Sequence, residues 1–213
     1  MQTTTGAARA TEILKAEHEV ILKVLDCLEK VSGDARRGGA IDLKSAEEIL
    51  DFLGTFADRC HHGKEEGALF PMLGKKGLPT QVGPVAVMLS EHEQGRAEIS
   101  GMRAAIASFA QGLAEGADRF ATHANAYIDL LRDHIAKENN VLFPMADGML
   151  GPVDQADLLA AFGRVESHDL GAGTHERYLA LVDALVARLG VTPPEERPFV
   201  HAGGCCGGKS GCH

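Results

Sequence analysis

Two short segments of the chain carry the same arrangement of histidine, lysine and glutamate, each followed by Leu-Phe-Pro-Met. The segment 61–72 reads HHGKEEGALFPM and the segment 134–145 reads HIAKENNVLFPM, so the two align without gaps. Each segment presents a histidine and, four residues later, a glutamate: His61 with Glu65, and His134 with Glu138. Residues four apart lie on one face of a helix, so each pair would direct an imidazole and a carboxylate to the same side.

A lone histidine lies upstream of each segment, at the centre of a Glu-His-Glu triplet. His18 occupies the triplet 17–19 and His92 the triplet 91–93, at nearly the same distance before their segments. Both histidines fall where the apolar rhythm of a core-facing helix would place Leu. The first four predicted helices are therefore two copies of one helical hairpin, and their packing would bring four imidazoles and two carboxylates into one interior.

Burying so many polar groups, two of them anions, is costly without compensation. A pair of divalent cations would supply it. Imidazole and carboxylate ligands suit iron or manganese better than structural zinc, and a single tetrahedral zinc would not need six ligands. The predicted metal ligands are His18, His61, Glu65, His92, His134 and Glu138.

These residues resemble the hemerythrin-like, His-His-Glu cation-binding family, over about residues 11–147. The resemblance implies a non-haem di-iron centre in which both glutamates and an oxo or hydroxo group bridge the two irons. Manganese or zinc is less expected at this centre than iron. Oxygen-carrying hemerythrin uses five histidines and two carboxylates, whereas the repeat defines only four histidines here.

Four histidines would leave about two of roughly twelve coordination positions open for water, dioxygen, nitric oxide or peroxide. An open site favours reaction, scavenging or sensing over reversible oxygen carriage. The alternative functions are iron storage or trafficking, and the iron donation for iron–sulfur cluster repair that the family suggests. The candidate partners are the small diatomic or peroxide ligand and a redox or iron-acceptor protein.

His62 competes with His61 for the role of ligand, because His62 and Glu66 are also four residues apart. The repeat favours His61, since Glu65 and Glu138 both lie six residues before their prolines. His62 is then an outer contact, a fifth ligand or a solvated side chain. The two lysines of the repeat, Lys64 and Lys137, are expected to be solvated.

Apolar periodicity predicts an all-α, antiparallel up-down four-helix bundle over residues 11–150, after a flexible lead-in at 1–10. The predicted helices span 11–31, 43–73, 84–109 and 115–145. The predicted inner faces include Ala68 in the second helix and Val141 in the fourth, and Pro71 and Pro144 are expected to stop these helices. Residues 151–190 form further helices that should pack on the outside of the bundle.

Residues 191–213 read as a linker and a Gly/Cys-rich tail that should be disordered without a ligand. Three of the five cysteines lie there, together with two histidines: Cys205, Cys206, Cys212, His201 and His213. The tail is either a soft-metal site that transfers metal or senses redox state, or an end with incidental cysteines. The remaining two, Cys27 and Cys60, are expected to be small buried hydrophobes.

The composition excludes some partners. The net charge is −9 and no Lys/Arg cluster is dense, which argues against nucleic acid. No apolar run approaches the roughly 18 residues that a membrane span requires. No signal peptide is evident at residues 1–10, and an odd cysteine count fits thiols in a reducing compartment, so the expected location is the cytoplasm.

Overall fold

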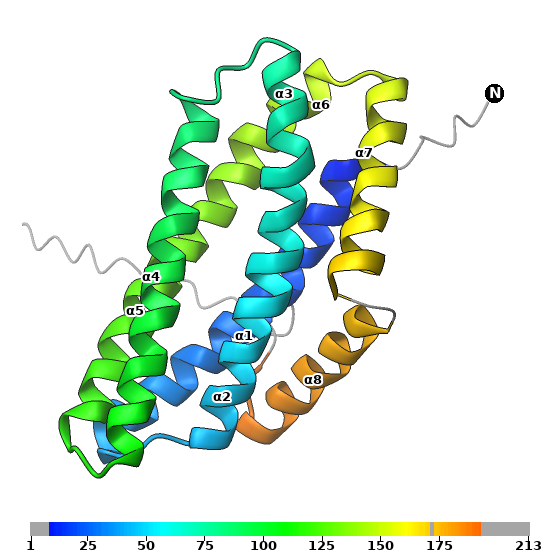
Figure 1. Ribbon diagram of the computed structural model, residues 1–213. Coiled ribbons are helices and arrows are strands. Elements are labelled where there is room, and N and C mark those ends of the chain that lie inside the picture. The colour runs from blue at the N-terminus through cyan, green and yellow to red at the C-terminus, as the bar shows by residue number, and fades with distance from the viewer. Residues whose placement is uncertain (1–8, 171–172, 193–213) are drawn as a thin grey trace, which may run out of the picture.

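The computed structural model describes residues 9–170 and 173–192, which form helices and contain no strand (Figure 1). The predicted all-α class is therefore confirmed for this part of the chain. The elements from α1 to α6 form four long helical passes that lie side by side, and consecutive passes run in opposite directions along the long axis (Figure 1). Their elements are α1 (Ala10–Gly38); α2 (Leu43–Phe52), η1 (Leu53–His62), η2 (Glu65–Leu69) and α3 (Phe70–Lys75); α4 (Pro84–Ala110); and α5 (Glu115–Lys137), η3 (Glu138–Leu142) and α6 (Phe143–Met149).

The first helix is longer than predicted. It continues past Gly33 and ends at Gly39, which has a φ of 65° and donates its backbone N–H to the carbonyl of Ala35. A residue in the left-handed conformation commonly ends a helix, and glycine adopts this conformation without a steric penalty. The predicted end near residue 31 is therefore too early, because the single glycine at position 33 weakens the helix without breaking it.

Neither repeat proline stops its helix. The amide of Phe70 donates five residues back to the carbonyl of Glu65, and the amide of Phe143 does the same to Glu138, so each helix widens into a π turn before the proline. A proline ring clashes with the carbonyl four residues earlier in a regular α-helix, and the wider turn accommodates it. The helices then continue as α3 and α6, which corrects the expectation of a stop.

The same π turns correct two predicted inner positions. Each turn inserts about one extra residue into the helical rhythm, so the residue that points inward after the glutamate moves by one. Leu69 and Leu142 are buried, whereas Val141 is 49% exposed and Ala68 is only partly buried.

The apolar core consists of two clusters with a polar layer between them. The larger cluster fills the half of the bundle that contains the α1–α2 and α4–α5 connections, and it includes Leu25, Phe56 and Phe120. The smaller cluster fills the half that contains the Phe-Pro segments, and it includes Leu14 and Met88. His18 lies between Leu14 and Ile21 of the two clusters on α1, so the predicted ligands occupy the layer between them.

The C-terminal extension consists of α7 (Pro152–Arg164), η4 (Val165–Leu170) and α8 (Thr174–Leu189). α7 packs on α1 and η2, and α8 packs on α1 and α2 (Figure 1). Leu158 and Phe162 of α7 join the smaller apolar cluster, and Tyr178 of α8 donates a 2.9 Å hydrogen bond to Asp51.

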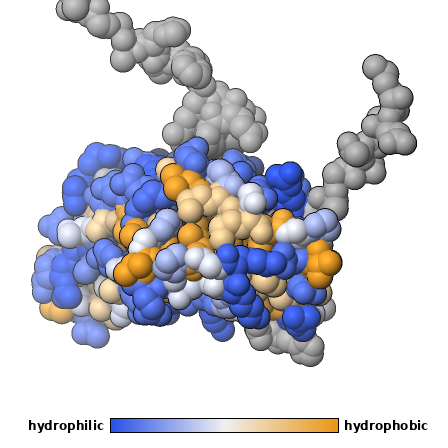
Figure 2. Space-filling model, turned by 90° about the horizontal axis from the view of Figure 1, so that it is seen from above, coloured by the Kyte–Doolittle hydropathy of each residue, from blue (hydrophilic) through white to orange (hydrophobic). Residues whose placement is uncertain are grey.

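α7 covers only the first copy of the repeat. The corresponding surface of the second copy is an open groove of about 290 Å³, lined by Val87, Met88, Lys137, Val141 and other residues of α4 and η3. Apolar side chains also reach the surface at the Phe-Pro end of the bundle, where Figure 2 shows orange residues among hydrophilic ones. These exposed side chains are Val82, Met145 and Val153.

No helix among the described residues is both long and apolar enough to cross a membrane. Most of the predicted lead-in and the whole Gly/Cys-rich tail, with Cys205, Cys206, Cys212, His201 and His213, lie outside the described residues.

Candidate metal centre

Four buried imidazoles converge in the layer between the two apolar clusters. The Nε2 atoms of His18 and His61 are 2.9 Å apart, and those of His92 and His134 are 3.2 Å apart. Each pair joins the lone histidine of one hairpin to the segment histidine of the same hairpin. The repeat therefore produces two equivalent imidazole pairs, as the sequence predicts.

Glu65 and Glu138 connect the two imidazole pairs. The Glu65 oxygens lie 3.6 Å from His61 Nε2 and 3.4 Å from His92 Nε2, while Glu138 Oε2 lies 3.2 Å from His18 Nε2 and 3.3 Å from His134 Nε2. All four carboxylate oxygens are buried, and none accepts a hydrogen bond. Buried carboxylate oxygens without donors are strongly unfavourable, so this donor set fits cations that would bind there.

The ligand atoms form two groups that share one carboxylate. We call the first the two-imidazole group and the second the three-imidazole group. The two-imidazole group contains His18, His61, Glu65 and Glu138, and the three-imidazole group contains His62, His92, His134 and Glu65. In each group the candidate ligand atoms lie within 4.8 Å of one another. The structure thus brings together all six residues predicted as ligands.

His62 lies in the three-imidazole group as well, although the sequence alone leaves its role open. It is only 4% exposed, and its ring stacks on His92 with centroids 3.8 Å apart. Its Nδ1 atom is buried without a hydrogen-bond partner, at 3.5 Å from Asp58 Oδ1. The solvated alternative for His62 is therefore wrong, because π-helical η1 turns His62 inward beside His61.

Each histidine of the repeat has an oxygen atom behind it, on the Nδ1 side of the ring. His61 Nδ1 lies 2.9 Å from Glu17, and His134 Nδ1 lies 3.0 Å from Glu91. A histidine that binds a metal through Nε2 carries its proton on Nδ1 and donates it to such an acceptor, which fixes the ring and makes it a better ligand. The Glu-His-Glu triplets therefore supply both the lone histidine and a carboxylate that supports the segment histidine of the same hairpin.

The lone histidines are supported by the opposite copy of the repeat. His18 Nδ1 lies 3.0 Å from Asn139 Oδ1, and His92 Nδ1 lies 2.7 Å from Glu66 Oε1. Asn139 and Glu66 occupy equivalent positions, directly after the two central glutamates. The two hairpins thus hold each other's histidines in place.

The expectation that both repeat lysines are solvated is wrong for Lys64. Its side chain is fully buried and pairs with Glu17, and also with Glu166 of η4 at 2.5 Å. Lys137 makes the equivalent pair with Glu91 but is 42% exposed. The difference arises from α7, because Phe162 lies over the Lys64 ammonium group at 5.8 Å from the ring centroid.

In the metal-free centre, the neighbouring charges do not fully offset the cost of burying the ionisable side chains, and their pKa values are shifted as a result. Burial, and next the charge of Glu138, raises the pKa of Glu65 well above its ordinary value. Burial also lowers the pKa of His134, but the negative charge of the nearby Glu138 carboxylate and the contact with Glu91 outweigh this and raise that pKa to about 9. Protons on Glu65 and His134 would be displaced by metal ions, so metal binding should release protons.

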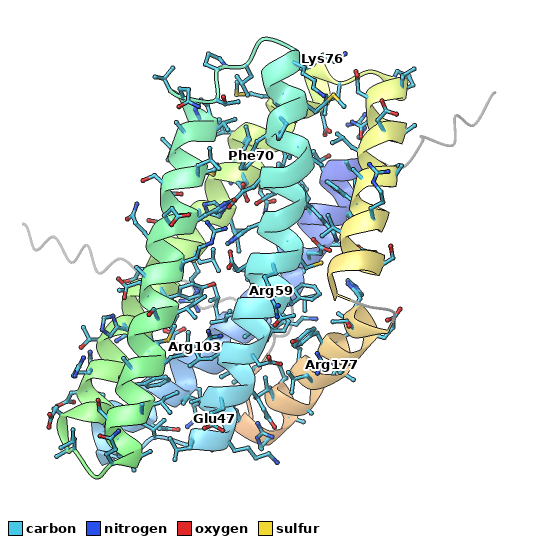
Figure 3. All side chains as sticks on the ribbon, viewed as in Figure 1. Glu47, Arg59, Phe70, Lys76, Arg103 and Arg177 are labelled. Atoms are coloured by element: carbon cyan, nitrogen blue, oxygen red, sulfur yellow. The ribbon has the colours of Figure 1, made fainter. Side chains whose placement is uncertain are left out.

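Aromatic side chains close the centre on its Phe-Pro side. Phe143 stacks on His18 with centroids 5.5 Å apart, and Phe70 stacks on His92 at 6.0 Å. Figure 3 shows Phe70 on the side of its helix that faces α4. The Phe-Pro part of each repeat therefore excludes water from one face of the centre.

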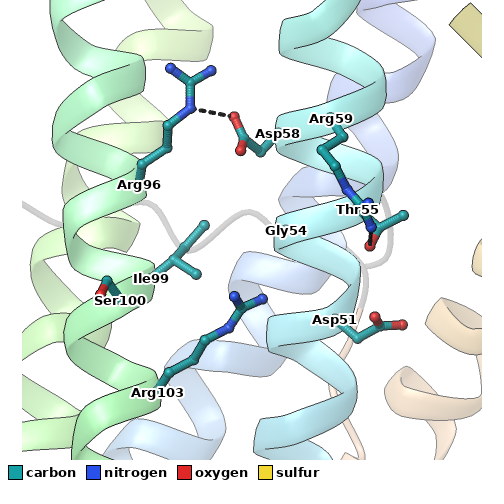
Figure 4. A pocket seen from close by; sticks show the side chains of 9 residues that line it. All are labelled: Asp51, Gly54, Thr55, Asp58, Arg59, Arg96, Ile99, Ser100 and Arg103. Atoms are coloured by element: carbon teal, nitrogen blue, oxygen red, sulfur yellow. Dashed lines mark hydrogen bonds and ion pairs between the residues drawn. The ribbon is translucent and has the colours of Figure 1, made fainter. Parts of the chain in front are cut away.

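A polar cleft of about 390 Å³ lies between η1 and α4, next to the three-imidazole group (Figure 4). In its wall, Arg96 donates to Asp58 at 2.8 Å, the pair marked in Figure 4. Arg96 also donates to Glu66 at 2.6 Å and to Glu93 at 2.6 Å. The Glu66 carboxylate behind His92 is thereby held by the Arg96 guanidinium in the wall of this cleft.

The hemerythrin HHE cation-binding domain matches residues 9–146, so the chain belongs to this family, whose members bind metal cations. The buried His/Glu groups could hold such a metal. Among curated relatives, the uncharacterized protein Rv1995 of Mycobacterium tuberculosis is 25% identical over 187 residues, which cover 85% of this chain and 71% of that protein.

The iron-sulfur cluster repair protein YtfE of Escherichia coli K12 is 39% identical over 93 residues, which cover 40% of each chain. The protein of the same name in Enterobacter shows the same identity and coverage. No solved structure matches the chain.

Proposed function

We propose that this protein holds two iron ions in a non-haem centre and reacts there with dioxygen, nitric oxide or peroxide. The observation that carries the proposal is the set of four buried carboxylate oxygens without hydrogen-bond donors, surrounded by four imidazole Nε2 atoms. The ligands of the pair would be His18, His61, Glu65, His92, His134 and Glu138.

The donor chemistry favours iron over structural zinc. Imidazole and carboxylate ligands suit iron and manganese, and neither Cys27 nor Cys60 belongs to the two ligand groups. Bound iron would supply one-electron redox chemistry towards a small ligand. Phe70 and Phe143 would exclude water, while Glu17 and Glu91 would hold the Nδ1 protons of their histidines.

His62 affects how many positions a small ligand could use. If His62 also binds, the open positions fall from about two to about one. The remaining position would belong to the ion in the two-imidazole group, beside His18 and His61. The pair of groups would then combine one filled ion with one open ion.

The test is metal analysis of purified protein reconstituted with ferrous ion under anaerobic conditions. We expect two irons per chain, a near-ultraviolet charge-transfer absorption after oxidation, and rapid changes in that spectrum with nitric oxide or peroxide. A His61→Ala/His134→Ala variant is the matched control, because it removes one imidazole from each copy. Equal iron content in this variant and the parent would refute the proposal.

A second candidate function is iron donation for iron–sulfur cluster repair, which is supported by the similarity to YtfE. The Cys205, Cys206 and Cys212 tail would then act as a metal-transfer arm. Deletion of residues 199–213, compared with a Cys→Ser variant at these three positions, tests it. Unchanged iron transfer to an apo iron–sulfur protein in both variants would exclude the tail from this role.

A further inference from the structure

The two halves of the metal centre differ in the groups that support their histidines, although the repeat makes the histidines themselves equivalent. Three of the four Nδ1 atoms face a carboxylate, from Glu17, Glu66 or Glu91. The fourth, on His18, faces the side-chain oxygen of Asn139. The presence of an amide where the other copy has an acid is thus one of the points at which the internal symmetry of the centre is broken.

This difference divides between the two ligand groups. In the two-imidazole group, His61 is supported by a carboxylate and His18 by a neutral amide. In the three-imidazole group, both His92 and His134 are supported by carboxylates. The lone histidines His18 and His92 are equivalent by the repeat, so Glu66 and Asn139 can be compared directly.

A carboxylate acceptor makes a metal-bound imidazole a stronger electron donor than an amide acceptor does. It attracts the Nδ1 proton, which increases the basicity of the ligand and stabilises the higher oxidation state of the metal. The effect is large at this site, because His92 is fully buried and charges interact more strongly away from water. We propose that Glu66 tunes the iron held by the three-imidazole group, so that this iron is oxidised before the one beside His18.

Arg96 opposes this effect without cancelling it. Its guanidinium contacts the same Glu66 oxygen that faces His92, at 2.6 Å, and so withdraws part of the negative charge. Arg96 is itself shared with Asp58 and Glu93, at 2.8 Å and 2.6 Å. One cation therefore serves three carboxylates, and the side behind His92 stays negative.

His62 also distinguishes the two groups, so the test must isolate Glu66. The variant Glu66→Gln keeps His62 and the shape of the side chain but removes the charge behind His92. The variant Asn139→Asp makes the reciprocal change behind His18. These two substitutions exchange acid and amide at repeat-equivalent positions, and each is the matched control of the other.

The inference rests on the proposed iron centre, and the experiment separates the two. The full-length chain is loaded with ⁵⁷Fe, its iron content is measured, and it is titrated with a one-electron oxidant in the presence of redox mediators. Mössbauer spectra identify the ferrous and ferric ions at each stage. We expect two separate one-electron steps in the parent protein, with the first electron leaving a single, spectroscopically distinct iron.

In Glu66→Gln the equilibrium constant for the first oxidation should fall about tenfold, which is about 59 mV for a one-electron couple. In Asn139→Asp the second oxidation should become easier by a similar factor, so the two steps move closer together. If both variants load two irons and neither step shifts, Glu66 has no tuning role. A parent chain that holds no iron would instead overturn the proposed function, and this inference with it.

Discussion

Lys64 and Lys137 occupy equivalent positions in the repeat but should differ sharply in their contribution to stability. Lys64 is fully buried and pairs with Glu17, which is only 3% exposed. Lys137 is 42% exposed, and its partner Glu91 is 12% exposed. We consider the variants Lys64→Met and Lys137→Met, which preserve much of the side-chain volume and remove only the charge.

The expected magnitude follows from burial. Removal of one partner from a buried ion pair costs about 3–5 kcal/mol, because the other charge stays buried without compensation. Glu17 keeps its contact with His61, and Glu166 is 40% exposed, so Lys64→Met should cost about 3 kcal/mol. An exposed pair contributes at most about 1 kcal/mol, so Lys137→Met should cost no more than that.

Urea unfolding of the metal-free protein, followed by circular dichroism at 222 nm, measures both changes on one scale. The slope of the unfolding free energy against urea should be the same in all variants, since a changed slope would indicate a different unfolded or native state. The double variant Lys64→Met/Glu17→Gln should recover part of the loss, because the unpaired charge is removed. Losses for the two lysines that agree within about 0.5 kcal/mol would refute the reasoning about burial.

Three further outcomes are expected. Burial, and next the charge of a neighbouring imidazole, lowers the pKa of His61 from 6.5 to about 4. The unfolded chain therefore binds this proton more readily, and His61 alone should cost the metal-free protein up to about 3 kcal/mol of stability as the pH falls from 6.5 to 4; an unchanged pH dependence of the unfolding free energy in a His61→Phe variant would contradict this. Burial raises the pKa of Cys27 to about 11 and that of Cys60 to about 12, so neither thiol should react with iodoacetamide at pH 8 until the chain is unfolded, as peptide mass spectrometry can show. An added Cβ at Gly116 would lie 2.6 Å from the backbone of Phe109 in the facing α4, so Gly116→Ala should lower the free energy of unfolding, measured with urea, by about 1–3 kcal/mol, whereas Gly148→Ala, which has open space, should not.

The six candidate ligands could be found from sequence because their chemistry depends on spacing along helices. A histidine and a glutamate four residues apart share a helix face whatever surrounds them, and the duplication shows which pair to choose. The same logic identified His18 and His92, because each interrupts an otherwise apolar stripe.

The environment of these ligands could not be predicted in the same way. Lys64 is buried because α7 packs over it. The repeat alone does not predict where a later helix will pack. A regular helical period places Val141 inward, but the π turn before Pro144 changes that period. A repeated proline after a ligand segment is a signal that could have indicated the widened turn.

Because α7 covers one side of the bundle, the two copies of the repeat have different outer surfaces. The flank of the first copy is sealed by Phe162 and Glu166, while the flank of the second copy keeps an apolar groove beside Lys137. Small molecules therefore reach the two copies through different surroundings, although the six candidate ligands repeat. The duplication supplies two similar half-sites, and α7 makes one flank of the centre closed and the other open.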